Sequence, residues 1–594
     1  MYFALETLIK LFIFLFFSIS IVGYGFLLKD RILKINFNFG EIGILGFFFL
    51  YLITNVLNFF VPIHIYLSLG ILFIGFVLFI NNHKKVIISK KLLACIIFLL
   101  LFISSLTINL HDDALLYQLP YVKYKQEFKI IFGLVYLNDF LAYSHGLYDT
   151  MALFKVPFFE NRLIFIIPII FFMFFILSMI EYLDKKENIT YTLIIFIAFL
   201  ILFKFTRSKE FGTDIPVVAL LFLVQIYLFK FLFPKDDAYF YKMLVMFTLA
   251  VLYKLYAALA IFYFLIFIFN LKKYFYDLVT NKRLIFIFLI FVSFVTFSKN
   301  IIQSGCLNFP ITFTCIDKQE LKWSAGKEIS EWRNEVLKAG VKGWMPYVRE
   351  NQYKDKIFPK QFNEQFKYNF HKYVFKDPDS EKILIILLIC LLVISLNFFS
   401  EEKNLKIKRP AQFTLFILCS LIPAILWFWL MPYARYGGYA YLSFSLIILY
   451  YSLTFKPYHL FKIANFILIF GIIYFLSKNI LRINNELVSN NNLDTAKSLL
   501  IKNLGNYQFK IKQINNEKKI YISSHNWWCG NVPIPCLPGF WENMNIKINE
   551  KYGYQIISVN QKEYLDFQIK KMNVYNLSKD RYYLDYNEEI RIKK

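Results

Sequence analysis

The chain is dominated by long apolar runs that contain no charged residue. Examples are residues 11–28, 42–60, 92–110, 163–180 and 413–430. Each run reaches the roughly 17–25 residues that a helix needs to cross a bilayer. No small-residue cleavage site follows the first run, so we expect a retained helix and not a removable signal peptide.

By the same length criterion we expect about 12 to 14 crossings and an all-α polytopic transmembrane helical bundle. The expected crossings lie near residues 7–28, 42–61, 65–81, 92–110, 163–182, 190–205, 216–233, 242–253, 255–270, 284–298, 383–399, 412–431, 437–454 and 461–477. The two short segments that flank Lys254 are also compatible with a hairpin that does not fully cross.

Composition agrees with a membrane protein and argues against a nucleic-acid partner. The chain is 58% hydrophobic and 18% charged, whereas soluble domains are roughly 45–50% apolar and about 25% charged. An aromatic content of 20% indicates either an AT-rich genome or a π-rich binding surface. The same codon bias raises the lysine count, and no nucleic-acid-binding motif accompanies the net charge of +25.

Basic residues cluster in alternate connections between the apolar runs. Since short loops rich in Lys and Arg stay in the cytoplasm, both termini and residues 111–161, 206–215, 299–382 and 432–436 are expected on the opposite side. The basic clusters are Lys29, Arg31 and Lys34; Lys84, Lys85, Lys90 and Lys91; Lys272, Lys273, Lys282 and Arg283; and Lys403, Lys406, Lys408 and Arg409.

Four cysteines form two close pairs, Cys306 with Cys315 and Cys529 with Cys536. Both pairs lie in segments that the charge pattern places outside the cytoplasm, where disulfides persist. A four-cysteine zinc site is the alternative, but the short CxxC spacing typical of such sites is missing. The sequence therefore predicts two short-loop disulfides.

Three hydrophilic regions are expected together on the outer face. Residues 111–161 mix apolar and charged positions in a way that suits short interfacial helices. Residues 299–382 form a long loop, and residues 478–594 form a C-terminal domain. Strand-like stretches at 518–523 and 554–560 predict that this domain is small and α/β.

Two adjacent carboxylates, Asp112 and Asp113, stand where the fourth expected helix ends. Ionisable residues at such positions in a polytopic protein are often functional. The alternative is that both aspartates cap the next helix, because Asp is a favoured N-cap residue.

The stretch from Asp113 to Pro120, Asp-Ala-Leu-Leu-Tyr-Gln-Leu-Pro, resembles the Asp-Ala-Leu-x-Tyr-His-Leu-Pro motif of GT-C glycosyltransferases. These multi-span enzymes use sugars carried on polyprenyl phosphate. The resemblance covers roughly residues 90–455 and suggests an uncharacterised bacterial branch. It departs from the family at Gln118, which replaces the usual His, and in three additional helices that precede the module. Weaker similarity lies at residues 123–137, 299–310 and 432–437.

The resemblance implies three parts: extra helices at 1–91, a GT-C-like catalytic module at 92–477, and the C-terminal periplasmic domain at 478–594. It implies a multi-pass protein of the bacterial inner membrane with its site facing the periplasm. The expected reaction moves a sugar from a polyprenyl-phosphate donor to a lipid, glycan or protein acceptor by inverting displacement.

In that reaction the resemblance places the acceptor-activating base at Asp113. Asp112 is either the base itself or a neighbour that raises the pKa of Asp113 by like-charge repulsion. Tyr117 and Gln118 belong to the expected substrate loop. Because Gln118 stands where the family has His, no residue at that position can shuttle a proton.

Cations near the membrane surface would hold the donor phosphate. Arg435 suits bidentate phosphate contacts, although a snorkelling interfacial anchor is the alternative. Lys254 lies between two apolar runs, where a charge is costly unless it is paired. The remaining candidates either bind substrate or only form solvated loops, and they are Arg207, Glu210, Asp214 and His145. No cofactor motif is present. A metal cannot be read from the sequence, because the aspartate pair lacks an obvious third ligand, and a divalent metal stays open.

Other functional classes stay open. A lipid-linked oligosaccharide polymerase or ligase shares the donor chemistry but normally relies on Arg-rich outer loops. A transporter or flippase of envelope glycolipids would show ionisable residues deep in spans or paired interrupted helices, whereas the charges here cluster at helix ends. A non-catalytic scaffold would tolerate loss of both aspartates.

Overall fold

The computed structural model describes most of the helical body and part of the C-terminal region. The described residues are 2–106, 113–143, 146–157, 161, 163–183, 194, 197–198, 202, 214–232, 236–341, 410–431, 434–442, 444, 458–488, 507–515, 518–525 and 529–565.

Within these residues, seven helices are long and apolar enough to cross a membrane, which supports the predicted class of helical membrane protein. They are Thr7–Leu33, Phe39–Phe60, Ile65–Lys85, Ile164–Glu181, Asp214–Leu232, Leu255–Thr280 and Arg283–Ser304. Three shorter apolar helices are Lys91–Ser104, Ala238–Tyr253 and Ile417–Leu430. The expected crossing at 383–399, and most of those at 190–205 and 437–454, lie outside the described residues, so the number of 12 to 14 stays a prediction.

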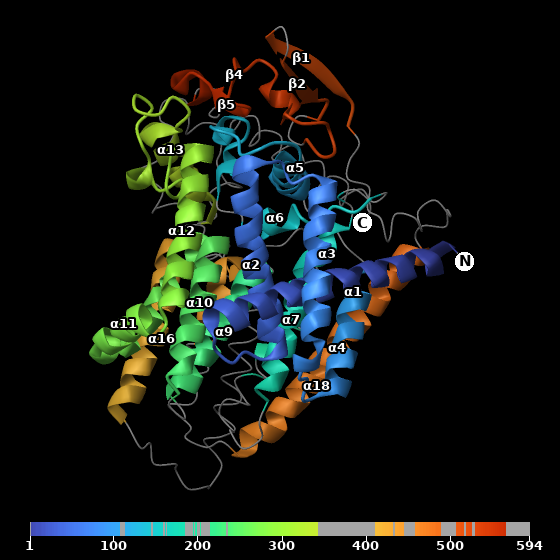
Figure 1. Ribbon diagram of the computed structural model, residues 1–594, viewed down its shortest axis with the longest axis vertical. Coiled ribbons are helices and arrows are strands. Elements are labelled where there is room, and N and C mark those ends of the chain that lie inside the picture. Colours follow the sequence, from blue (N-terminus) through green and yellow to red (C-terminus); the bar gives the residue numbers. More distant parts are fainter. Residues whose placement is uncertain are drawn as a thin grey trace, which may run out of the picture.

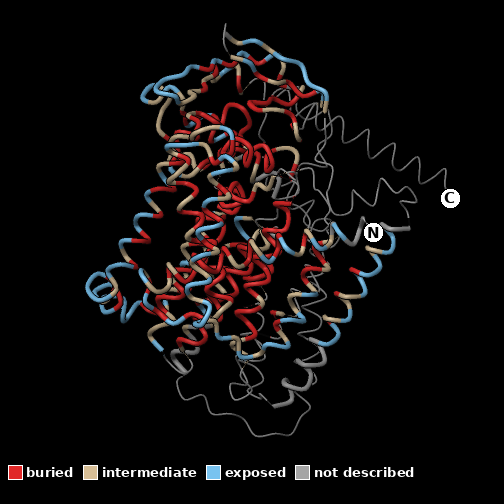
Figure 2. Tube along the Cα trace, turned by 45° about the vertical axis from the view of Figure 1, so that its right-hand side comes forward, coloured by how far each residue is buried: buried red, intermediate tan, exposed pale blue. Residues whose placement is uncertain are grey.

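The long elements are α1 (Tyr2–Leu28), α2 (Phe39–Phe60), α3 (Ile65–Asn82), α4 (Lys91–Ser104), α7 (Ile167–Glu181), α9 (Asp214–Leu232), α10 (Ala238–Tyr253), η7 (Leu255–Asn270), α12 (Arg283–Ser304), α16 (Pro410–Leu430) and α18 (Tyr458–Val488). In Figure 1, α2, α3, α10 and α12 run along the length of the body, α1 lies across them, and the strands lie together at one end. Figure 2 shows the buried residues concentrated along the middle of this body.

Glycines allow α1 and α2 to pack with their backbones almost in contact. A Cβ atom added at Gly25 would lie 1.9 Å from the carbonyl oxygen of Ile42, and one added at Gly46 would lie 1.9 Å from that of Ile21. Close approach at small residues is how membrane helices gain packing energy without a hydrophobic drive between them.

A break in the helical body falls at Lys254, between α10 and η7. The backbone of Lys254 is extended, with φ −154° and ψ 132°. The segment after the break is a 3₁₀ helix, which rises about 2.0 Å per residue against about 1.5 Å in an α-helix. At that rise its 16 residues span about 32 Å, close to the roughly 30 Å of a bilayer's hydrocarbon core, and this length argues against a hairpin that stops part-way. The helix α11 (Leu271–Thr280) follows it.

The last long helix differs from its predicted extent. α18 continues to Val488 instead of ending near residue 477. The polar residues that follow 477 contain no Gly or Pro before 488, and therefore they extend the helix.

The hydrophilic regions come together at the strand end of the body (Figure 1). Their elements include η3 (Ala114–Gln118), α5 (Leu119–Glu127), η5 (Asp139–Ala142), α6 (Gly146–Met151) and α13 (Gly326–Val341). The C-terminal part has a three-stranded sheet, β1 (Phe509–Asn515), β2 (Lys518–Ser523) and β3 (Cys536–Leu537), and a hairpin, β4 (Lys547–Lys551) and β5 (Tyr554–Ser558).

Backbone hydrogen bonds join the strand region to the first hydrophilic loop. The Gly530 N–H donates to the Leu115 carbonyl at 3.1 Å, and the Ile557 N–H donates to the Phe132 carbonyl at 2.8 Å. The Tyr564 hydroxyl donates to the Val135 carbonyl at 3.2 Å. These bonds place the C-terminal region directly over η3 and α5.

Candidate functional site

Asp113 stands immediately before a tight helical turn. Residues 114–118 form η3, a π-type turn, and α5 follows with Pro120 in its first turn. The Leu119 N–H donates to the Ala114 carbonyl, so η3 and α5 form one continuous helix. The Asp113 side chain makes no capping hydrogen bond to the turn, so the capping interpretation is wrong for this residue.

The Tyr117 ring lies against two further aromatic rings. It stacks on Phe140, with ring centroids 5.1 Å apart and planes inclined by 11°, and meets the edge of Tyr148 at 6.5 Å. Burial raises the pKa of the Tyr117 hydroxyl well above its ordinary value, and the negative charge of Asp113 raises it further. Asp113 is therefore a close electrostatic neighbour of this hydroxyl.

Gln118 completes this early part of the site. It is 2% exposed, and its Nε2 lies 3.4 Å from the Tyr117 hydroxyl, at the long end of hydrogen-bond range. Its Oε1 is buried and has no hydrogen-bond partner in the part of the chain that the structure describes. A buried amide oxygen without a partner is costly, and it leaves an acceptor available beside Tyr117.

A segment more than three hundred residues later reaches the same place. The turn η10 (Ala434–Gly438) carries Tyr436, which is close enough to Tyr117 to affect its pKa. The Tyr436 ring also lies 5.9 Å from that of Tyr256. Arg435 therefore belongs to this turn by its backbone, but its side chain lies outside the described atoms.

Lys254 is paired across the break between α10 and η7. Its Nζ lies 3.8 Å from Asp214 Oδ1, and the two side chains are 22% and 24% exposed. Tyr256 and Tyr436, in ring contact, link this pair to η10. Tyr436 and Tyr256 thus connect Tyr117 with the segment that carries Lys254. Asp112, His145, Arg207 and Glu210 lie outside the described residues.

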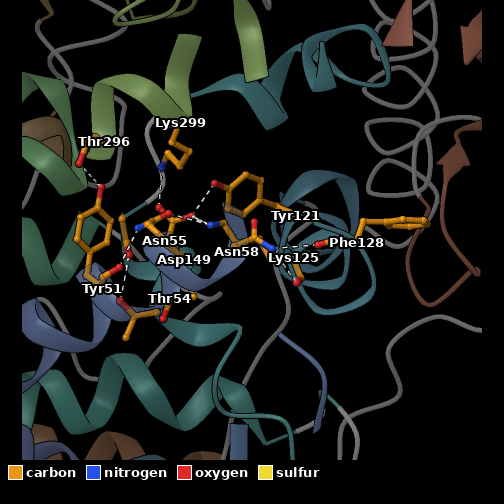
Figure 3. A network of polar contacts seen from close by, with 12 residues as sticks. Tyr51, Thr54, Asn55, Asn58, Tyr121, Lys125, Phe128, Asp149, Thr296 and Lys299 are labelled. Carbon is orange, nitrogen blue, oxygen red and sulfur yellow. Dashed lines mark hydrogen bonds and ion pairs between the residues drawn. The ribbon is translucent and has the colours of Figure 1, made fainter. Parts of the chain in front are cut away.

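A buried ion cluster beneath the site was not predicted. Asp149, on α6, lies 2.9 Å from Lys125 Nζ and 2.7 Å from Lys299 Nζ, and it accepts a hydrogen bond from the Tyr121 hydroxyl at 2.6 Å. Figure 3 shows these side chains converging on Asp149. The side chains of Asp149, Lys299 and Lys125 are 0%, 1% and 3% exposed. We call these four residues the Asp149 cluster.

The cluster carries one more positive than negative charge. Burial alone would raise the pKa of Asp149, but Lys125 and Lys299 outweigh burial and lower it to about 2. Burial lowers the pKa of Lys125 to about 8, and Lys299 contributes in the same direction. Lys125 therefore loses its proton more easily than an ordinary lysine, and it also donates to Asn55 Oδ1 at 2.8 Å.

The Asp149 cluster fixes the two elements that carry the site. Tyr121 and Lys125 are four residues apart on α5, so they share one face of the helix that continues from η3. Tyr148, next to Asp149 on α6, is the residue whose edge meets Tyr117. At the start of α6, a Cβ atom at Gly146 would lie 2.4 Å from a ring carbon of Tyr253, so α6 has no room to shift.

A second buried pair ties α13 to the same region. Arg333 Nε lies 3.0 Å from Asp139 Oδ2, and the side chains are 5% and 1% exposed. The Arg333 guanidinium lies 4.1 Å from the Phe140 ring centroid and donates to the Tyr143 hydroxyl. Burial alone would lower the pKa of Arg333, but Asp139 and Tyr143 raise it above its ordinary value. Arg333 thus supports the ring on which Tyr117 stacks.

Two disulfides stabilise loops at this end of the molecule. Cys306 is bonded to Cys315, and Cys529 is bonded to Cys536. In the described residues, no group of three or more His, Cys, Asp or Glu side chains is placed to hold a metal ion.

The apolar helices and the polar site at their end define a polytopic membrane protein. A family model described as "Domain of unknown function (DUF8201)" matches residues 7–443, and the chain belongs to that family. The match includes both η3 and η10, the two turns that form the site, and it ends before the strands. No curated protein and no solved structure matches the chain.

Proposed function

We propose that the protein is a membrane glycosyltransferase that moves a sugar from a polyprenyl-phosphate donor to a lipid, glycan or protein acceptor. The observation that carries this proposal is the placement of Asp113. Its carboxylate does not cap the turn that follows it, and it lies beside Tyr117 at the polar end of the apolar helices. This placement suits a base that acts at the membrane surface.

In this proposal the acceptor hydroxyl attacks the anomeric carbon while Asp113 takes its proton. The bond from that carbon to the phosphate oxygen breaks, and the lipid phosphate leaves with the electron pair. A positioned general base contributes typically about 10²–10⁴-fold to such a step. Because attack and departure occur on opposite sides, the configuration at the anomeric carbon inverts.

Cations near η10 would stabilise the leaving phosphate, since preorganised charge acts most strongly where new charge develops. Lys254 lies in this neighbourhood through Tyr256 and Tyr436, and Arg435 belongs to the same turn by its backbone. Asp214 holds Lys254 in place until the donor arrives.

We place the site on the periplasmic face of a bacterial inner membrane. Support comes from the basic residues of the loops at the other end of the helices. Both disulfides lie at the end that carries the site, and disulfides persist outside the cytosol.

The test is sugar transfer by the purified protein in nanodiscs, with radiolabelled polyprenyl-phosphate sugars and membrane lipids as acceptors. Asp113→Asn keeps the size of the side chain and removes its charge, so transfer should fall by about 10²-fold or more. Donor binding should change much less. Asp317→Asn is the matched control, because Asp317 is a 49% exposed carboxylate at the same end of the molecule, paired with Lys327 at 3.1 Å.

Arg435→Ala should instead weaken donor binding, because it removes a charge-assisted contact to phosphate. Folded Asp113→Asn protein with wild-type transfer would exclude the proposed base. Transport of labelled glycolipid without transfer would favour the flippase alternative, and extension of a lipid-linked glycan would favour the polymerase or ligase.

A further inference from the structure

A cavity of about 670 Å³ lies far from this site, between residues 34–36, 236–242 and 273–282. The helices α2, α10 and α12 all begin beside it. The other ends of α2 and α10 lie at the candidate site. α2 ends at Phe60, and the nearby Ile63 N–H donates to the Lys125 carbonyl of α5. α10 ends at Tyr253, which packs against α6. The cavity is therefore at the opposite end of the helical body, where α11 lies in Figure 1.

Most charged groups on its wall are already satisfied by neighbours. Asp237 accepts from the Tyr274 hydroxyl at 2.6 Å and pairs with Lys273 at 2.8 Å. Asp277 accepts from the Tyr241 hydroxyl. These carboxylates serve the wall itself and do not repel a ligand strongly.

The inner wall rests on a buried ion pair. Lys242 Nζ lies 3.0 Å from Glu41 Oε2, with the two side chains 8% and 0% exposed. Glu41 also accepts from the hydroxyls of Tyr182 and Tyr227. This pair holds the start of α10 against the start of α2 and keeps the cavity open between them.

Four wall charges form no ion pair with another described residue, namely Lys34, Lys282, Asp236 and Asp277, and of these Asp277 is held by hydrogen bonds from Tyr241 and Asn281. One oxygen of Asp236 accepts from the Ala238 N–H at 2.9 Å. Lys34 has a φ of +50°, an uncommon conformation for a residue other than Gly, Asn or Asp. The cavity therefore presents two ammonium groups without an ion pair, those of Lys34 and Lys282, and the carboxylate of Asp236.

The presence of both signs of charge on the wall favours a ligand that carries both signs. The wall has four lysines and three aspartates: Lys34, Lys242, Lys273 and Lys282 against Asp236, Asp237 and Asp277. A purely anionic ligand would leave the carboxylate of Asp236 without a counter-charge. Four tyrosines line the same space, and their rings attract cations: Tyr239, Tyr241, Tyr274 and Tyr276.

α11 places this cavity at the membrane interface. One side of the helix packs inward through Tyr274 and Leu278, while Phe275 and Val279 are 59% and 40% exposed. Lysines near its start and exposed apolar residues along one side are typical of a helix that lies in the interface plane. Lipid headgroups occupy that level, and tyrosine is enriched there.

We propose that this cavity binds the headgroup of a zwitterionic phosphoethanolamine lipid from the leaflet opposite the candidate site. Lys34 contacts the phosphate, Asp236 contacts the ammonium group, and the tyrosine rings surround that ammonium. The acyl chains run along the exposed apolar side of α11. This inference does not depend on the proposed transferase activity.

The test measures lipid binding to delipidated, detergent-solubilised protein by native mass spectrometry. The probes are phosphatidylethanolamine, phosphatidylglycerol and soluble glycerophosphoethanolamine. Asn tolerates a positive φ, so Lys34→Asn removes the charge without new strain. Asp236→Asn keeps the acceptor for Ala238. Lys85→Gln is the control, because Lys85 is an exposed lysine that pairs with Asp30 outside the cavity.

Wild-type protein should prefer phosphatidylethanolamine to both other probes. Each cavity variant should weaken that binding about tenfold or more, since each loses one charge-assisted contact. Only Lys34→Asn should weaken binding of phosphatidylglycerol, and the control should change neither. Equal affinity of the wild type for the two lipids would overturn the proposal, as would unchanged phosphatidylethanolamine binding in both folded variants. Equally tight binding of glycerophosphoethanolamine would overturn the assignment to a lipid.

Discussion

Asp149→Asn should destabilise the protein more than its conservative shape suggests. Asn occupies nearly the same volume, but it leaves Lys125 and Lys299 as two buried ammonium groups without a counter-charge. The side chains of these lysines are 3% and 1% exposed, so water does not screen them. The Tyr121 hydroxyl also loses its charged acceptor.

The magnitude of this destabilisation follows from the charges of the Asp149 cluster. The pKa of Asp149, about 2 instead of 3.8, means that its neighbours favour the ionised form by about 2–3 kcal/mol. Removing one partner of a buried pair adds the cost of the charge that remains, and such losses are typically about 3–5 kcal/mol. We expect a loss of that size in the free energy of unfolding.

The assay is reversible denaturant unfolding in detergent micelles at pH 7, with Asp30→Asn as the control. Asp30 pairs with Lys85 at 2.6 Å, but the side chains are 30% and 55% exposed, and exposed pairs contribute only about 0–1 kcal/mol. The double variant Asp149→Asn with Lys299→Met should recover part of the loss, since it removes one unpaired charge. If Asp149→Asn is no more destabilising than Asp30→Asn, the cluster does not carry the free energy assigned to it.

Three other expectations concern pH, cysteine chemistry and topology. The pKa of Lys125 falls from 10.5 to about 8 on folding. Between these two pH values the unfolded chain therefore binds one more proton than the folded chain, and the free energy of unfolding should rise with pH by up to about 1.4 kcal/mol per unit. Lys125→Met should flatten this slope in the same unfolding assay, and the same slope in the variant and the wild type would contradict the assignment. Alkylation without reductant, followed by mass spectrometry, should leave Cys306, Cys315, Cys529 and Cys536 unmodified, and free thiols at both pairs would remove the support for an outside location. An exported phosphatase should be active when it is fused after Gly133, after Ser330 or after Ser523. A cytoplasmic signal from any one of these fusions would contradict the proposed topology.

Helix positions were readable from the sequence because burial in lipid demands long apolar runs. The ends of helices were less predictable where polar residues continue a helix. Glu41 was placed just before the expected crossing at 42–61, yet it lies inside α2 and is 0% exposed. Asn38 and Glu41 form a capping box, a pattern of Asn followed three residues later by Glu that would have located the helix start.

The buried charges were not predictable in the same way. Asp149 and Lys125 lie in a region whose mixture of apolar and charged residues suits short interfacial helices, in which charged side chains are expected to face water. Their partner Lys299 is 150 residues from Asp149 along the chain. Local patterns report how polar a segment is, whereas long-range packing decides which of its charges lose water. In the sequence, the position of Lys299 near the end of an apolar run was the feature that could have indicated a buried, paired charge.

The position of α2 explains why the charges of both the Glu41–Lys242 pair and the Asp149 cluster need partners. Glu41 lies in its first turn and pairs with Lys242, and Asn55 near its other end receives a hydrogen bond from Lys125. The fourteen residues between them span about 21 Å at 1.5 Å per residue, less than the roughly 30 Å of hydrocarbon in a bilayer. Both ends of this helix therefore carry polar groups at depths where an unpaired charge is expensive. A helix held by an ion pair near one end and by a hydrogen bond from a lysine near the other cannot slide or rotate without breaking one of them. The candidate site and the headgroup cavity consequently keep fixed positions at opposite ends of α2.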